Sequence, residues 1–102
     1  MFGFILRAVK RRPVEKSIYT PEYDRFRELL IELRSDRDLT QTDLARRLGD
    51  GWTQTKVSKC ERGERRLDII EVRRWCHALG VSFPEFAKML HGALPTMRSR
   101  GK

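Results

Sequence analysis

The sequence predicts an all-α domain built from five short helices. Two observations support this prediction: apolar residues recur at helical spacing in one segment, and one helix-start pattern then occurs four times. No stretch alternates apolar and polar residues for long enough to predict a strand. The predicted helices cover residues 21–36, 40–48, 53–62, 68–79 and 83–91.

The first helix is predicted from Thr20 and Pro21, which are an N-cap residue and a first-turn proline. The apolar residues that follow have the i, i+3, i+4, i+7 spacing of an amphipathic helix: Phe26, Leu29, Leu30 and Leu33.

The four later helices share a start pattern. In each, one apolar residue stands directly before the N-cap residue, and a second apolar residue follows four positions after the cap. This is the arrangement of a hydrophobic staple. The caps are Thr40, Thr53, Asp68 and Ser82. Glu71 and Glu85 follow two of these caps at the position of a capping box. Glycines at positions 49, 63 and 80 are predicted to end the second, third and fourth helices.

The chain of 102 residues suits one modest hydrophobic core. The core is predicted from the apolar stripe of each helix, which comprises Phe26, Leu29, Leu30, Leu33, Leu44, Ala45, Leu48, Val57, Cys60, Val72, Trp75, Cys76, Leu79, Phe86 and Leu90.

We divide the chain into a basic and apolar N-terminal extension (1–19), a folded domain (20–91) and a basic C-terminal tail (92–102). The extension lacks the order of charge and apolar residues in a signal peptide, and it falls short of the roughly 20 apolar residues of a membrane span. Docking on the domain, pairing with a partner chain and disorder all stay open for it.

The net charge is +8 and is unevenly distributed. Residues 53–66 carry +3 and residues 1–20 carry +4, whereas residues 21–52 carry −2. This distribution favours a polyanionic partner, with nucleic acid ahead of a membrane surface.

Catalysis and metal binding have little support in the sequence. Cys60 and Cys76 are predicted core residues, which indicates a reducing, cytoplasmic environment. His77 and His91 give no paired ligand spacing around them, so we expect no metal site and no cofactor. No catalytic Ser-His-Asp or Cys-His set and no Gly-rich phosphate loop occurs. The sequence therefore predicts that the protein is not an enzyme.

Three motifs together resemble the helix-turn-helix DNA-binding domain of the Xre, Cro and phage-repressor family. They are "LTQTDLARRLG", "QTKVSKCERGERRLD" and "ALGV", and the resemblance covers about residues 22–90. It implies a compact lambda-repressor-like fold for residues 20–91. It also implies that the helix over residues 53–62 lies in the major groove of double-stranded DNA.

On that helix, Val57 and Cys60 are predicted to point inward. The polar side chains on its outer face are our predicted base-reading residues: Gln54, Thr55, Ser58 and Lys59. Gln can bond adenine, Lys can donate to guanine, and the methyl group of Thr can contact thymine. The alternative for each is a solvated helix face.

Gln41 stands where the family uses a Gln to bind a phosphate and to brace the recognition helix. The cations predicted to contact phosphates are Lys56, Arg62, Arg65 and Arg66. Arg46 and Arg47 either do the same or only solubilise the second helix. The resemblance also implies an ion pair between Arg34 and Glu61, to which we assign a structural role.

The turn between the second and third helices departs from the family pattern. Asp50 and Gly51 look like a two-residue insertion, and Trp52 stands in the place of the apolar turn residue. We expect the insertion to affect individual base contacts more than the fold. Trp52 is predicted to be a staple residue against Val57, in preference to a platform for base stacking.

The leading functional prediction is a sequence-specific transcriptional regulator of phage or bacterial type, a repressor that binds its DNA operator as a homodimer. It would be cytoplasmic and associated with the nucleoid. The dimer contact is expected from Val81, Phe83, Phe86 and Leu90 or from the N-terminal extension. The alternatives are an antitoxin that represses its own promoter and binds a toxin, and a protein-interaction module that retains the fold. The cations on the outer face of the third helix favour DNA.

Overall fold

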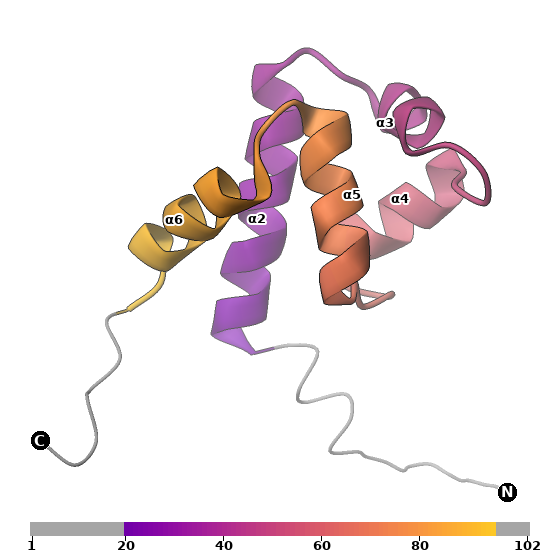
Figure 1. The fold of residues 1–102 in the computed structure, drawn as a ribbon. Coiled ribbons are helices and arrows are strands. Elements are labelled where there is room, and N and C mark those ends of the chain that lie inside the picture. Colours follow the sequence, from indigo (N-terminus) through magenta and orange to yellow (C-terminus); the bar gives the residue numbers. More distant parts are fainter. Residues whose placement is uncertain (1–19, 96–102) are drawn as a thin grey trace, which may run out of the picture.

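The computed structural model describes residues 20–95, and this part of the chain forms five helices and no strand (Figure 1). The helices are α2 (Pro21–Asp36), α3 (Gln41–Leu48), α4 (Gln54–Glu61), α5 (Ile69–Leu79) and α6 (Phe83–Ala93). The all-α prediction is therefore confirmed. The predictions for residues 1–19, and for the tail after residue 95, lie outside the described residues.

Each helix begins at a capped N-terminus. The cap side chain accepts a hydrogen bond from the backbone N–H three residues later, at distances between 2.8 and 3.2 Å. Glu71 accepts the return bond from the Asp68 N–H, which completes the predicted capping box of α5. The box predicted for α6 forms only in part, because the exposed Glu85 makes no return bond within the described chain. A complete box that was not predicted links Thr40 and Asp43 in α3.

The C-terminal boundaries agree with the predicted stops except in α6. Gly49, Gly63 and Gly80 follow α3, α4 and α5 with positive φ angles. The last helix was predicted to end at residue 91, but it continues through Gly92 to Ala93. The chain becomes extended only at Leu94, because the following proline disfavours helical backbone in the residue before it.

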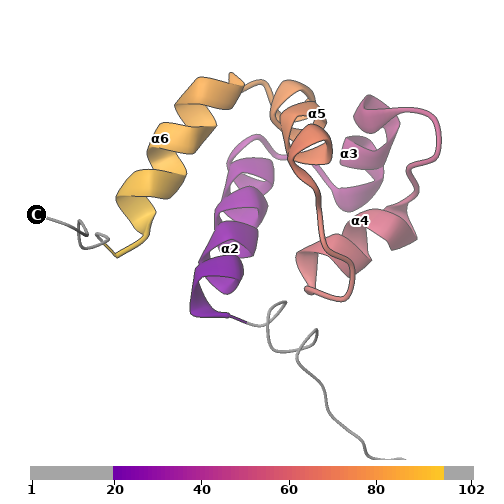
Figure 2. The same ribbon diagram turned by 60° about the horizontal axis from the view of Figure 1, so that its bottom comes forward.

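The helices pack so that α2 and α5 separate the α3–α4 pair from α6 (Figures 1 and 2). Helix α3 packs against α4 and α5, while α2 packs against α4 and α6, and α5 also contacts α6. This arrangement leaves the outer side of α4 uncovered by the other described helices.

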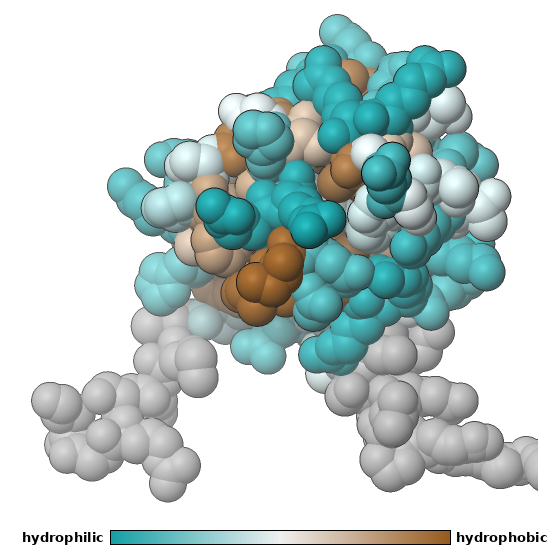
Figure 3. All heavy atoms as spheres, turned by 45° about the vertical axis from the view of Figure 1, so that its right-hand side comes forward, coloured by the Kyte–Doolittle hydropathy of each residue, from teal (hydrophilic) through white to brown (hydrophobic). Residues whose placement is uncertain are grey.

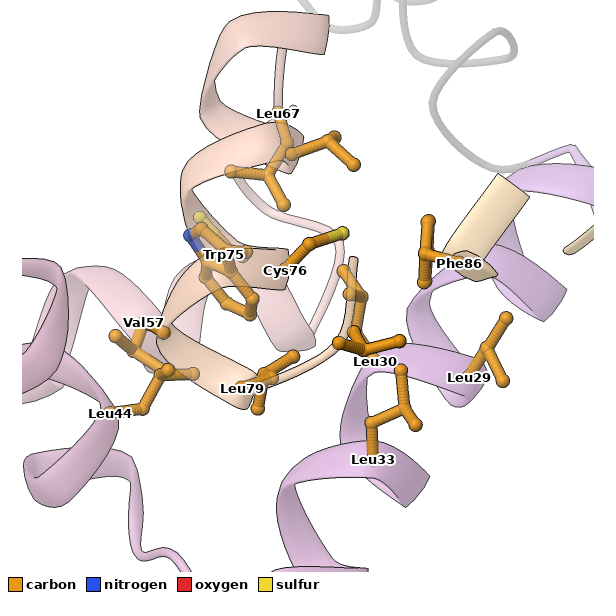
Figure 4. Close-up of a cluster of buried hydrophobic side chains, with 14 of the residues drawn as sticks. Leu29, Leu30, Leu33, Leu44, Val57, Leu67, Trp75, Cys76, Leu79 and Phe86 are labelled. Carbon is orange, nitrogen blue, oxygen red and sulfur yellow. The ribbon is translucent and has the colours of Figure 1, made fainter. Parts of the chain in front are cut away.

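The core contains most of the predicted apolar residues. Trp75 is fully buried in α5, and Figure 4 shows Leu44, Val57 and Leu79 gathered around its ring. Two predicted core residues are only partly buried, Leu48 and Leu90. Three buried residues were missed, namely Leu67, Ala78 and Val81. Leu67 and Val81 precede caps, where the pattern predicts a staple and does not by itself predict full burial.

Candidate nucleic-acid interface

Helix α4 is anchored by its inner face and presents polar side chains on its outer face. Val57 and Cys60 are buried in the core, whereas Gln54, Thr55 and Lys59 are exposed. Ser58, the fourth predicted base-reading residue, is half-buried. Figure 3 brings the α3–α4 side of the molecule forward, and hydrophilic surface dominates this view.

A buried carboxylate at the end of α4 connects three helices. Glu61 is only 6% exposed, and it forms a bidentate pair with Arg34 of α2. Arg34 Nε lies 2.6 Å from Glu61 Oε2, and Arg34 Nη2 lies 3.0 Å from Oε1. Gln41 of α3 donates a further bond of 2.8 Å to Oε1. Because α2, α3 and α4 each contribute one group, this cluster fixes the position of α4 relative to the two helices beside it.

The same cluster continues to the surface of α4. The side-chain oxygen of Gln41 accepts a 2.6 Å hydrogen bond from Gln54 Nε2. A chain of bonds therefore runs from the Arg34–Glu61 pair through Gln41 to Gln54, the first residue of α4. The sequence assigned these four residues to three separate roles, and the structure joins them in one network.

A second anchor holds the C-terminal end of α4 against α2. Arg27 donates a 2.5 Å bond to the backbone oxygen of Glu61 and a 2.7 Å bond to Asp24. Its guanidinium lies against Gly63, where a Cβ atom would come within 3.0 Å of Arg27 Nε and φ is +82°. Sequence reasoning missed Arg27, because a cation on the polar side of an amphipathic helix has no pattern that distinguishes it from solvated neighbours.

Trp52 packs between the core and two cations. Its ring meets Trp75 edge-on at a centroid distance of 5.9 Å. Lys56 Nζ lies 4.6 Å from the Trp52 ring centroid and also donates to the Gly51 carbonyl at 3.0 Å, while the Arg65 guanidinium lies 5.2 Å from the same ring. This packing makes Trp52 a support of the turn before α4.

The other predicted phosphate ligands also have contacts within the chain. Arg62 pairs with Glu64 at 2.8 Å and donates to the hydroxyl of Ser58. The Arg66 guanidinium lies 5.0 Å from the centroid of the Tyr23 ring. These contacts orient the two arginines beside the C-terminal end of α4.

The two arginines of α3 have different surroundings. Arg46 is exposed and lies 3.6 Å from Asp43. Arg47 donates a 3.1 Å bond to the backbone oxygen of Ala78 in α5. Arg47 therefore ties the end of α3 to α5, at the opposite end of α3 from Gln41.

Comparison with known proteins identifies the fold family. A family model described as a helix-turn-helix domain matches residues 25–89. A solved structure, an XRE-family like protein from Pseudomonas syringae pv. tomato str. DC3000, is similar at a TM-score of 0.68 and 37% sequence identity. The match covers 82% of this chain and 100% of that one. This chain belongs to the XRE-like helix-turn-helix family. No protein matches in a search of the curated sequences.

At the level of the family, this helix-turn-helix protein is a DNA-binding regulator. Helices α3 and α4 form the helix-turn-helix unit, and α4 is the second helix of that unit, which in this motif enters the major groove. The turn between them is closed by a 3.1 Å bond from the Trp52 N–H to the Gly49 carbonyl.

The two thiols of the helix-turn-helix domain lie inside the core. Burial raises the pKa of the Cys60 thiol and raises that of Cys76 to about 11. Both thiols are therefore protonated at neutral pH, the form that is a poor nucleophile and a poor metal ligand. Within residues 20–95, no group of three His, Cys, Asp or Glu side chains is arranged to hold a metal ion. No helix in that range has the length and apolar composition to cross a bilayer.

We expect Glu61→Ala to lower the free energy of unfolding by about 3 kcal/mol, because it leaves the guanidinium of Arg34 without its buried partner. Urea denaturation measures this loss. Glu64→Ala is the matched control, because it removes an exposed carboxylate from the turn after α4 and should leave the free energy of unfolding close to that of wild type. A Glu61→Ala protein with wild-type stability would contradict a structural role for the pair.

Acid should remove a contribution of Glu71 to stability. The hydrogen bond from Arg65 lowers the pKa of Glu71 below its ordinary value of 4.5. The unfolded chain therefore takes up this proton at a higher pH than the folded protein, and the stabilisation present at neutral pH decreases as pH falls below 4.5. In urea denaturation from pH 7 to pH 3, the stability difference between wild type and Glu71→Gln should narrow with falling pH. Glu22→Gln controls for the loss of an exposed carboxylate. A stability difference between wild type and Glu71→Gln that does not vary with pH would contradict a stabilising role for the ionised Glu71.

Proposed function

We propose that the protein is a sequence-specific transcriptional repressor that reads the major groove of double-stranded DNA with α4. The observation that carries this proposal is the bond network from Arg34 and Glu61 through Gln41 to Gln54. It holds the first turn of α4 in a fixed position while Gln54, Thr55 and Lys59 stay exposed. A repressor of this kind needs only to occupy its operator, which requires neither catalysis nor a cofactor. Its place of action is the cytoplasm, on the nucleoid.

Gln54 is the central base-reading residue of this proposal. Its Nε2 group already donates one bond to Gln41, which leaves its second N–H and its side-chain oxygen for the donor and acceptor pattern of adenine. Holding the side chain in place before DNA arrives reduces the entropy lost on binding. Thr55 and Lys59 extend the contact along α4, toward a thymine methyl group and a guanine respectively. Ser58 acts through Arg62, whose guanidinium its hydroxyl helps to orient.

The surrounding polar groups supply phosphate contacts that carry no direct sequence information. Arg62 and Arg66 are exposed and lie beside the end of α4, so they are the strongest candidates among the cations. Lys56 and Arg65 are half-buried on Trp52, and their charge acts on the DNA at longer range. Gln41 is also proposed to contact a phosphate, because it stands at the start of α3, where the family has a phosphate-binding Gln.

The dimer surface predicted from the sequence is only partly available. Phe83 and Leu90 are half-buried, and the N-terminal extension, the other predicted contact, lies outside the described residues. Val81 and Phe86 were expected at the dimer contact, but they are only 8% and 2% exposed because they complete the core of the single chain. The large hydrophobic residues that are exposed among the described residues are Ile69 and Ile70.

We assign the contact between two copies to Ile69 and Ile70. They form the first turn of α5, directly after the loop that leaves α4, so the patch lies close to the proposed DNA-binding side. Two copies on adjacent half-sites, about one helical turn of DNA apart, can then bury these side chains against each other.

The DNA-reading proposal is tested by selecting bound duplexes from a random library at near-physiological salt. Wild type should enrich a two-fold-symmetric site. Gln54→Ala with Lys59→Ala should weaken binding to that site by about 100-fold, because each good base contact contributes roughly 1–3 kcal/mol. Lys88→Ala, on α6, removes a positive charge away from α4 and should keep the same selected sequence. Equal enrichment by wild type and the double variant would overturn the proposal.

The dimer contact is tested with Ile69→Gln and Ile70→Gln together, a change that leaves the net charge unaltered. The variant should keep its melting temperature, since both side chains are exposed, and should bind a duplex with one half-site as wild type does. Its cooperative binding to a duplex with two half-sites should be lost, as measured by electrophoretic mobility shift and sedimentation. Retained cooperativity would exclude this surface.

A further inference from the structure

A cavity of about 630 Å³ lies between the end of α3, the outward side of α5 and the start of α6. Its lining contains Arg47, Arg73, Arg74 and His77, and no acidic side chain. Leu48 and Phe83 contribute apolar surface to the same cavity. The size falls within the range of ligand pockets, and the charge of the lining selects for an anionic ligand.

The cavity lies at the opposite end of α3 and α5 from the proposed DNA-reading surface. Helix α3 begins at Gln41, which bonds to Gln54 of α4, and ends at Leu48 beside the cavity. Helix α5 begins next to the loop from α4, and its middle and last turns line the cavity with Arg73, Arg74 and His77. At about 1.5 Å per residue, α3 is roughly 12 Å long, and Gln41 and Leu48 lie at its two ends. None of the residues assigned to the DNA contact lines the cavity, so the two proposed ligands use different side chains.

Two of the four basic side chains have a structural explanation. Arg47 bonds to the carbonyl of Ala78 near the end of α5, and His77 lies in the last turn of that helix. Cationic groups at these positions stabilise helix C-termini.

Arg73 and Arg74 differ from that pair. They precede the last turn of α5, both are exposed, and neither forms a hydrogen bond or ion pair with another residue of the described chain. Unpaired guanidinium groups next to a cavity are suited to bidentate bonds with carboxylates.

We propose that this cavity binds an acidic segment of a partner protein, with carboxylates on Arg73 and Arg74 and an apolar side chain against Leu48 and Phe83. The mixed lining favours a polypeptide over a free phosphate, because a phosphate would use the cations and leave the apolar surface exposed. Binding of the acidic segment in the cavity does not depend on the proposed DNA-binding function. Only simultaneous occupation by DNA and partner depends on the proposed function.

The test uses fluorescence anisotropy with the full chain and two synthetic labelled peptides at near-physiological salt. One peptide carries glutamates interspersed with leucine and phenylalanine, and the other replaces these apolar residues with serine at the same length and charge. Tripolyphosphate is added as a competitor. Arg73→Gln with Arg74→Gln is compared with Lys59→Gln and Arg62→Gln, which removes the same charge from the α4 side, and thermal melting verifies that both variants fold.

The Arg73 and Arg74 variant should bind the apolar-acidic peptide about ten-fold more weakly, because it loses charge-assisted hydrogen bonds, and should bind DNA within two-fold of wild type. The Lys59 and Arg62 variant should bind the apolar-acidic peptide within two-fold of wild type and should bind DNA more weakly. Wild type should prefer the apolar-acidic peptide to the serine-substituted peptide. If both variants weakened binding of the apolar-acidic peptide equally, the effect would come from net charge alone and the proposal would be overturned. Equal binding of both peptides, with displacement by tripolyphosphate, would indicate an anion site without a protein partner.

Loss of DNA binding in the Arg73 and Arg74 variant would overturn the proposal by making the cavity part of the DNA contact. Failure of wild type to bind DNA, with selective peptide binding retained, would refute the proposed function and leave this inference standing.

Discussion

The buried ion pair between Arg34 and Glu61 is the interaction on which the DNA-facing side of this protein depends. A carboxylate that is nearly inaccessible to water requires full compensation, and Glu61 receives it from two guanidinium bonds and one amide bond. The donors come from α2 and α3, so satisfying this one charge also sets where α4 lies. The exposed side chains of α4 are thereby held in one geometry before any ligand binds.

The turn before α4 is supported by aromatic packing. Gly51 has a φ of +84°, which permits the reversal, and its carbonyl accepts a bond from Lys56. Trp52 then turns back onto Trp75, a residue with no exposed surface. Lys56 and Arg65 lie over the Trp52 ring, so cations predicted from the sequence to contact phosphates also support the turn. The turn is therefore held by local contacts, while Val57 and Cys60 fix the inner face of α4 in the core.

The charged surface of the domain divides into two regions with different neighbours. Near α4, most cations have an acidic or aromatic partner in the chain, which limits their motion and fixes their direction. On α5, Arg73 and Arg74 have no such partner within residues 20–95 and border a cavity that also has apolar walls. Net charge alone treats these groups as equivalent, whereas their surroundings suit them to different ligands.

The sequence by itself determined the helices and most of the core, because caps, staples and helical spacing are local patterns that need no knowledge of packing. The family followed from the resemblance of three sequence motifs. The sequence also located Gln54, Thr55 and Lys59 on the outer face of α4. Only the tertiary structure revealed the bond from Gln41 to Gln54, the role of Arg27 and the burial of Val81 and Phe86. Each of these depends on groups far apart in the sequence that meet only when the helices pack, and spacing along one helix carries no information about the neighbour that covers it.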